Sequence, residues 1–390
     1  MVKKYKIILI AMSLIVVGFA MKSWGALRNY RELNELSIVS AIGIDKQDNG
    51  DYLISVQIMN TKKESGETQG SESNSQIIVY KQSARTISLA LQNMIKESPK
   101  KLYTAHMNLL VINEKLARDE GISIILDYFF RDVEANKEFV TLIARKTSAE
   151  EILKTFAPTD TNPAKDLVNR YGTMLLYQGN VANSVASNLL ELYLEPGMGV
   201  TCSSVVLKNE NEQSKKMPDT AEISDIAYFK DEKLKGYLEG FDNIAYNFLQ
   251  DNILSTVLEL DYQGIPISFE VFKNITKYNV SAENGEFSID YDIQVRGNLI
   301  EIDNPETSKT PVDIEKMQNY ISNQLKERLD RYVSNVKNVY DTDIIGIESL
   351  AYKFQNKAYL KVKDRFNFKD IKVNISVKTE IANEGGLLKK

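Results

Sequence analysis

The last third of the chain has the clearest pattern of hydrophobic and polar positions. Apolar residues alternate with polar ones over residues 287–295 and again over residues 371–381. A period of two predicts long strands with one buried and one solvated face, which is usual in antiparallel sheets. Between them, apolar residues recur every three or four positions over residues 314–336, which predicts an amphipathic helix.

That helix is predicted to extend from about Pro311 to Tyr340. Thr310 is a suitable N-cap, and Pro311 suits the first helical turn, where an N–H would have no partner within the helix. An apolar stripe along so long a helix must be buried against a sheet or another helix. We therefore expect a multi-domain α+β fold in which a long helix packs on an antiparallel sheet in the C-terminal domain.

Strand-like and helix-like patterns alternate through the rest of the chain. Asn49-Gly50 separates two apolar runs within residues 36–58 and is a strong signal for a hairpin turn. This alternation predicts mixed or antiparallel sheets packed with helices. Further strands are predicted over 77–80, 107–112, 138–144 and 200–207, a hairpin over 226–238, and helices over 83–97, 122–130, 148–156, 162–194 and 243–250.

The first residues have the pattern of an export signal or a membrane anchor. Three lysines precede an uncharged run from Ile7 to Met21, and a basic head before an apolar run is typical of both. The run is short for a spanning helix, which needs about 20 residues, although Tyr5 and Trp24 suit the membrane interface. The lysines predict that everything after the run faces outward. We predict an anchor over residues 1–27, with a cleaved signal as the alternative.

Breaks in the patterns predict the domain organisation. An N-terminal α+β region is expected over residues 28–200, with room for two subdomains. A boundary strand and a polar linker follow over residues 201–218, because Pro196-Gly197 ends a helical region and the segment before Pro218 is strongly polar. A C-terminal α+β domain is expected over residues 219–385.

Composition narrows the chemistry that the chain can perform. Its 390 residues include 48 basic and 53 acidic ones, a net charge of −5, whereas a chain-wide nucleic-acid binder is usually basic. His106 and Cys202 are the sole residues of their types. This excludes an internal disulfide, a cysteine zinc cluster and a multi-histidine metal site. Any Ser-His-Asp or Cys-His enzyme would depend on His106, so we predict no catalytic residues, cofactor or metal.

Three features have competing interpretations. His106 precedes an apolar strand and is interpreted as a structural, hydrogen-bonded histidine, with a general base as the alternative. Cys202 lies in an apolar strand and is expected to be buried and inert. Residues 353–366 interleave basic and aromatic side chains. We interpret them as a solvated helix-and-loop surface, with nucleic-acid binding and contact with anionic lipid headgroups as alternatives.

Several strings of the sequence resemble the Ger(x)C family of spore-germination proteins. Their order and spacing match the family, and together they extend over nearly all of residues 30–384. The resemblance rests on Tyr30–Lys46, Ala105–Arg118, Phe130–Glu134, Phe229–Leu238, Asp343–Ile347 and Phe368–Ile375.

The resemblance implies a C subunit of a nutrient germinant receptor, with an α+β fold of three unlike domains and no known catalysis. Such subunits sit on the outer face of the inner spore membrane. They assemble with an A subunit and a transporter-like, multi-spanning B subunit. Family members usually carry a lipidated cysteine directly after the signal, and Leu27 stands at that place here. Lipid attachment is therefore unavailable, and we expect the N-terminal segment itself to contact membrane lipid and hold the chain.

We therefore predict a non-catalytic, outward-facing, membrane-tethered subunit of a spore nutrient germinant receptor that acts in receptor assembly or signal coupling. A- and B-type membrane subunits are its expected partners, and nucleic acid is not. Arg31, Glu32 and Asp45 lie between the anchor and the first hairpin and are candidate partner contacts, with local salt bridges as the alternative. An exported small-solute-binding protein of the cell envelope is the alternative function, which a cleft between the two halves would favour. An extracytoplasmic hydrolase is a third.

Overall fold

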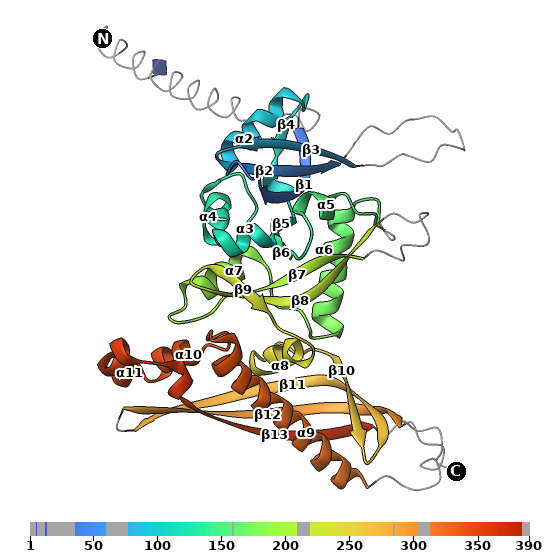
Figure 1. The fold of residues 1–390 in the computed structure, drawn as a ribbon, viewed down its shortest axis with the longest axis vertical. Helices are drawn as coiled ribbons and strands as arrows, with labels where there is room; N and C mark the ends of the chain where they lie inside the picture. Colours follow the sequence, from blue (N-terminus) through green and yellow to red (C-terminus); the bar gives the residue numbers. More distant parts are fainter. Residues whose placement is uncertain are drawn as a thin grey trace.

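The computed structural model shows an elongated molecule with its two sheets one beyond the other along the long axis (Figure 1). It describes residues 5, 12–13, 36–59, 77–157, 160–208, 219–283, 285–302 and 313–383. The first sheet and its helices form the N-terminal unit, residues 36–238. The second sheet and its helices form the C-terminal unit, residues 241–383. The predicted fold class, α+β with mixed sheets packed with helices, is confirmed.

The sheet of the N-terminal unit has a parallel centre and antiparallel margins. Among the described residues, its strands follow the order β3-β2-β1-β5-β6-β7-β8-β9, and the short β4 pairs with β1. β1, β5, β6 and β7 are parallel, whereas the hairpins at both margins are antiparallel. The strands are β1 (Leu36–Lys46), β2 (Tyr52–Met59), β3 (Ile77–Ala84), β4 (Lys101–Tyr103), β5 (Leu109–Asn113), β6 (Val140–Ala144), β7 (Thr201–Lys208), β8 (Thr220–Lys230) and β9 (Lys233–Tyr237).

Helices cover both faces of this sheet, and each face has its own hydrophobic core. Leu110 and Ile112 of β5 share a core with α2, α3, α4 and α7, whereas Leu109 and Val111 share another with α5 and α6. Strands buried on both faces give continuous apolar runs instead of alternation. The helices are α2 (Ile87–Asn93), α3 (Glu114–Asp119), α4 (Ser123–Arg131), α5 (Ala149–Leu153), α6 (Pro163–Tyr177) and α7 (Ala186–Leu194).

The C-terminal unit has a sheet in the order β10-β11-β12-β13, whose buried face packs on helices. The first three strands are antiparallel, and β11 with β12 forms a long ribbon. The strands are β10 (Thr256–Tyr262), β11 (Ile265–Glu283), β12 (Glu286–Ile302) and β13 (Lys372–Asn383). The helices are α8 (Phe241–Leu249), α9 (Ile314–Asn335) with a π-helical turn (Val336–Tyr340), α10 (Ile347–Phe354) and α11 (Asn356–Val362).

The expectation of a purely antiparallel C-terminal sheet is wrong. β13 is parallel to β12, with Ile293 opposite Val377. Parallel neighbours need a crossover connection, and α9 lies in that connection (Figure 1). Alternation along a strand reports that one face is buried and says nothing about the direction of the neighbouring strand. The sequence pattern therefore identified both strands but not their relative direction.

The long helix is confirmed, with corrections at its start and in its neighbours. Its N-cap is Asp313, whose side chain accepts a hydrogen bond from the backbone N–H of Lys316 at 3.1 Å. The predicted cap, Thr310, lies outside the described residues. Residues 162–194, predicted to be mainly helical, form the two helices α6 and α7, whereas no strand was expected where β10 and β11 lie. The predicted stripe on α9 is buried at Met317, Ile321, Leu325, Leu329 and Val333.

The first sheet continues beyond the predicted linker. β8 and β9 follow residues 209–218 in sequence, yet β8 pairs with β7 and β9 pairs with β8, so both extend the N-terminal sheet. The division at 201–218 stays a prediction. Nearly all of the predicted anchor, residues 1–27, lies outside the described residues, and within the ranges that the structure does describe no helix is long and apolar enough to cross a membrane.

Candidate functional site

Asp45, a predicted partner contact, lies inside the protein. Its carboxylate accepts hydrogen bonds from the backbone N–H groups of Ala149 (2.8 Å) and Glu150 (3.0 Å), at the start of α5. These amides have no partner within the helix, so Asp45 satisfies them. Burial raises the pKa of Asp45, and the residue is only 6% exposed. Asp45 therefore links α5 to β1 by hydrogen bonds. A buried residue in this position is not available for contact with a partner protein. The other predicted positions lie outside the described residues: Leu27, Arg31 and Glu32.

The histidine and the cysteine occupy opposite environments. His106 is exposed at the end of a 3-10 turn, and its ring meets that of Tyr103 edge-on with centroids 5.6 Å apart. Cys202 is fully buried, and its thiol donates to the carbonyl oxygen of Thr141 at 3.0 Å. Burial raises the pKa of this thiol to about 12. The prediction of a buried cysteine is confirmed, whereas His106 lies at the surface.

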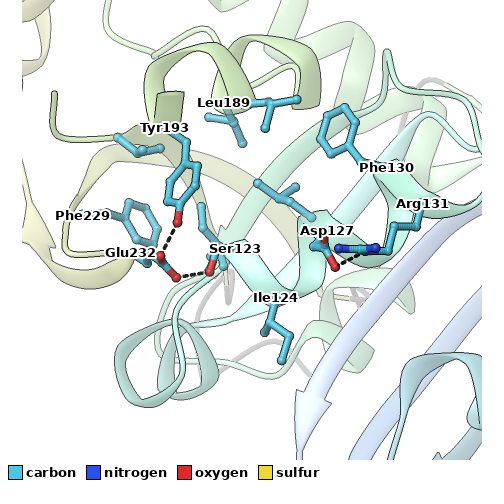
Figure 2. Close-up of a pocket in the computed structure, with 13 residues that line it drawn as sticks. Ser123, Ile124, Asp127, Phe130, Arg131, Leu189, Tyr193, Phe229 and Glu232 are labelled. Carbon is cyan, nitrogen blue, oxygen red and sulfur yellow. Dashed lines mark hydrogen bonds and ion pairs between the residues drawn. The ribbon is translucent and has the colours of Figure 1, made fainter. Parts of the chain in front are cut away.

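A pocket of about 390 Å³ lies between α4, α7 and the β8–β9 hairpin of the N-terminal unit (Figure 2). Cavities of this size are typical of small-molecule sites. Its polar side chains are Ser123, Asp127, Arg131, Tyr193 and Glu232. Its walls are otherwise apolar and include Leu126, Phe130, Leu189, Leu190, Val200 and Phe229.

An unusual turn presents Glu232 to this pocket. Asp231 and Glu232 are the two residues between β8 and β9, and both have positive φ, 50° and 70°. Such turns favour glycine, asparagine and aspartate, so a glutamate at the second position is uncommon. The carbonyl oxygen of Glu232 accepts from the N–H of Ile122 at 3.3 Å. Gly121 lies so close that a Cβ there would be 2.6 Å from the same oxygen. The turn therefore packs against the residues at the start of α4.

The side chain of Glu232 connects α4 to α7. The hydroxyl groups of Ser123 and Tyr193 donate hydrogen bonds to its two carboxylate oxygens (Figure 2). These bonds lower the pKa of Glu232, so the carboxylate is ionised at neutral pH. Across the pocket, Arg131 pairs with Asp127 at 2.7 Å. The lining thus contains two carboxylates, Asp127 and Glu232, and one guanidinium, Arg131. One negative charge therefore has no cation within the lining.

Polar contacts beside α7 and β8 join the two units, and we call them the inter-unit joint. Glu195, after α7, forms a salt bridge with Lys353 of α10 at 2.6 Å and accepts a hydrogen bond from Ser349. Lys230, at the end of β8, pairs with Asp341 at 2.8 Å. Apolar residues of the N-terminal unit also enter the core of the C-terminal unit, among them Ile226, Tyr228 and Leu238. The pocket thus lies within the N-terminal unit and not between the two halves of the chain, where a cleft would favour solute capture.

Two aspartates near the joint, two residues apart, have pKa shifts of opposite sign. Asp341 is exposed, and hydrogen bonds from two lysines, one of each unit, lower its pKa to about 2. Asp343 is buried, and loss of solvation raises its pKa to about 6. The backbone N–H groups of Ile347 (2.9 Å) and Glu348 (2.8 Å) nevertheless donate to the Asp343 carboxylate. Asp343 therefore accepts hydrogen bonds from the backbone N–H groups at the start of α10, as Asp45 does at the start of α5.

The pocket offers binding groups of a limited kind. Its lining contains hydroxyl, carboxylate and guanidinium groups but neither the histidine nor the cysteine of the chain. Within the described part of the chain, no cluster of three or more His, Cys, Asp or Glu residues is placed to hold a metal ion. A carboxylate in an apolar setting can bind a cation by a charge-assisted hydrogen bond.

Sequence reasoning missed this pocket because no residue type in it signals chemistry by itself. A signal was nevertheless present. Two of the strings that carry the family resemblance, Phe130–Glu134 and Phe229–Leu238, are far apart in sequence, and both contribute to the lining. Had these strings been expected to meet in space, Glu232 would have become a candidate.

Family models match both halves of the chain. The model described as "Spore germination protein N-terminal domain" matches residues 29–205. The model described as "Spore germination B3/ GerAC like, C-terminal" matches residues 224–385. The chain belongs to the Ger(x)C family of spore germination proteins. The resemblance found in the sequence is thereby confirmed.

Individual Ger(x)C relatives are similar along most of the chain. Spore germination protein KC of Bacillus subtilis (strain 168) is 27% identical over 372 residues, which cover 91% of each chain. Spore germination protein B3 of the same strain is 23% identical over 359 residues, covering 89% of this chain and 91% of that protein. The crystal structure of the GerBC protein has the same fold, with a TM-score of 0.56 at 19% identity, over 88% of this chain and 97% of the other.

Proposed function

We propose that this Ger(x)C chain is a non-catalytic subunit of a spore nutrient germinant receptor that acts in receptor assembly or signal coupling during germination. The observation that carries the proposal is the match of both halves to spore germination family models. A fold alone does not define a function, so the family supplies the biological setting. Contact with neighbouring subunits is the means that we propose.

The inter-unit joint supports a role in coupling. Salt bridges and a shared core fix the two sheets end to end. A force or contact applied to one unit is then passed to the other, because rigid packed elements transmit displacement. A subunit built in this way can connect two partners that bind at opposite ends of the long axis.

The N-terminal segment provides the tether in this proposal. Residues 1–27 hold the chain at the outer face of the inner spore membrane, in place of the lipid that Leu27 cannot accept. Tethering raises the local concentration of the chain near the A- and B-type membrane subunits. Arg31 and Glu32 stay proposed as membrane-proximal contacts. N-terminal sequencing of membrane-extracted protein tests the tether: a start at or next to Met1 is expected, and a start between Met21 and Ala26 would contradict it.

Deletion of the chain followed by a germination assay tests the biological role. Spores without the chain are expected to lose their response to at least one nutrient, and the full-length chain should restore it. A complementing chain with Leu325→Asp, which removes a buried residue of α9, should fail to restore the response. An unchanged response across a broad nutrient panel would refute the role in nutrient sensing.

Capture of a small solute is the second candidate function. The observation that favours it is the pocket beside Glu232, whose volume and mixed lining suit a small ligand. Titration calorimetry of the full chain with amino acids, sugars and simple amines separates the two candidates. Tight, saturable binding would promote solute capture, whereas its absence leaves contact between subunits as the function.

A further inference from the structure

We propose that the pocket between α4, α7 and the β8–β9 hairpin binds an organic ammonium ion, in which a single positive charge is attached to a short apolar group. The ammonium group lies against the Glu232 carboxylate, and the apolar group lies between α4 and α7. For a free amine, this inference rests on the second candidate function, solute capture, and for either source it can fail without affecting the deletion test.

The charge of the lining selects a cation. Ser123 and Tyr193 donate to Glu232 through hydroxyl groups, which carry no charge. The lining's guanidinium, Arg131, is already paired with Asp127. A ligand with one positive charge therefore neutralises the pocket. A zwitterion fits less well, because its carboxylate would lie beside the Asp127 carboxylate that already pairs with Arg131.

The walls of the pocket select an apolar group beside the charge. The side chains of Leu189 and Phe130 face the cavity between the two helices (Figure 2). Among the lining residues, Ile124 is 55% exposed and Tyr193 is 42% exposed, so a ligand can cover apolar surface that contacts water. An aliphatic or aromatic group of a few carbons buries this surface and is favoured by the hydrophobic effect.

The backbone at Glu232 gives independent support. Its φ of 70° lies in the region that glycine adopts without strain and that a glutamate adopts at a cost in stability. Strained residues are concentrated at binding and catalytic sites. A structural clamp between α4 and α7 is the competing explanation. A clamp needs only hydrogen-bond acceptors at this position, whereas an ammonium site needs the negative charge.

Three ligands of one shape test the charge requirement. The full chain is reconstituted in lipid nanodiscs and titrated at pH 7 with 3-methylbutylamine, 3-methylbutan-1-ol or 3-methylbutanoate, and empty discs serve as the blank. Ligand-observed NMR and calorimetry are expected to show saturable binding of the amine. The alcohol should bind at least about tenfold more weakly, since it lacks the charge-assisted bond. Equal binding of the amine and the alcohol would overturn the proposal.

Variants of the turn separate the ammonium site from the clamp. Glu232→Gln keeps acceptor oxygen and shape but removes the charge, so amine binding should weaken at least about tenfold while the melting temperature changes little. Glu232→Gly suits the positive φ, keeps the fold and should abolish the preference for the amine. Asp231→Asn is the matched control, because Asp231 has the same backbone conformation but is exposed and outside the lining. It should bind the amine normally.

The ammonium group can belong to a free amine or to a lysine side chain of another protein. A capped tripeptide with lysine between two leucines, and its norleucine counterpart, represent the second source. Binding of the lysine peptide that depends on Glu232, with weaker binding of the free amine, assigns the site to a protein partner. Binding of neither, or binding that Glu232→Gln leaves intact, overturns the proposal. Such a failure leaves the deletion test unaffected, so the two proposals fail separately.

Discussion

The two units bury their sheets in different ways. On β6 of the N-terminal unit, the neighbours Leu142 and Ile143 are both fully buried, in the cores on opposite faces of the sheet. On β12 of the C-terminal unit, Ile293 is fully buried and the next residue, Gln294, is exposed. The centre of the N-terminal sheet is buried on both faces, whereas the C-terminal sheet has one buried face and one solvent-exposed face. Within each unit, this difference determines where substitutions are tolerated.

The functional features follow the same division. The pocket occurs in the N-terminal unit, where helices on one face of the sheet meet the hairpin at its margin. The wet face of the C-terminal sheet instead carries side chains that bond to one another across strands, such as Asn374 to Asp290 at 2.6 Å and Arg296 to Glu380 at 2.9 Å. The pocket beside Glu232 therefore belongs to the first unit, and a separate cavity of about 490 Å³ lies beside α8 and β10 of the second. The solvent-exposed face of the second sheet offers a polar surface.

The largest effect is expected in the buried stripe of α9. Leu325→Asp buries an unpaired charge and removes a packed side chain, since Leu325 is 1% exposed. The free energy of unfolding of the C-terminal unit should fall by about 5 kcal/mol or more. Denaturant titration followed by circular dichroism measures it. Leu360→Asp on α11 is the control, at a residue 57% exposed, and should change stability by no more than about 0.5 kcal/mol. Similar curves for both variants would show that α9 is not packed as described.

Truncation of adjacent residues sharpens the comparison of the two sheets. Leu142→Ala and Ile143→Ala should each destabilise the N-terminal unit by about 2–5 kcal/mol, because each leaves a cavity in a different core. On β12, Gln294→Ala should have an effect within about 0.5 kcal/mol. Thermal and denaturant unfolding of the three variants provide the test. If one of the two β6 variants were as stable as wild type, one face of that sheet would be solvated.

The pH dependence of stability tests the buried aspartate of the C-terminal unit. The raised pKa of Asp343, about 6, means that its contribution to stability is fully present below the pKa of the unfolded chain, near 4, and is lost as pH rises through about 6. The shift corresponds to about 3 kcal/mol across that window. Denaturant midpoints between pH 4.5 and 7 should show this decline in wild type and a flatter profile in Asp343→Asn.

Asp341 supplies the control for that experiment. Its pKa is lowered to about 2, so its contribution is present above the pKa of the unfolded chain and is lost only as pH falls toward 2. Asp341→Asn should therefore keep the wild-type slope between pH 4.5 and 7. A flattened slope in Asp341→Asn, or an unchanged slope in Asp343→Asn, would contradict the assignment.

The smallest effect is expected at the inter-unit joint. Glu195→Gln weakens the salt bridge with Lys353, in which the two side chains are 27% and 50% exposed. Partly exposed pairs contribute about 0–1 kcal/mol, so global unfolding should hardly change. The two units should nevertheless become less firmly connected. Limited proteolysis near the joint should be faster than in the control Glu222→Gln, which loses the exposed pair with Lys208 of the N-terminal unit. Equal rates would argue against a fixed joint.

Much of the fold follows from the sequence, for identifiable reasons. The hairpin at Asn49-Gly50 and the stripe of α9 depend on local signals, a turn dipeptide and a period, and both were predicted. The direction of β13 depends on the crossover of the chain, which periodicity does not encode. The continuation of the first sheet through β8 and β9 depends on pairing across a polar segment, which appeared in the sequence as a boundary.

The candidate site was much less predictable. Asp45 looked like an exposed acidic residue near a turn, but tertiary packing places α5 over its carboxylate. Glu232 looked like one of many charged residues in a hairpin turn, and its role depends on Ser123 and Tyr193, which come from two separate helices. Sites assembled from distant segments by neutral side chains have no local signature, so their residues become recognisable only in three dimensions.

Affinity purification from spore membranes tests the central claim most directly, namely that this chain works by contact with membrane subunits. Tagged full-length chain, expressed in place of the native one, is solubilised and captured, with an untagged strain and the Leu325→Asp chain as controls. The account predicts that multi-spanning A- and B-type subunits co-purify with the wild-type chain and not with either control. Recovery of the folded wild-type chain alone would contradict it.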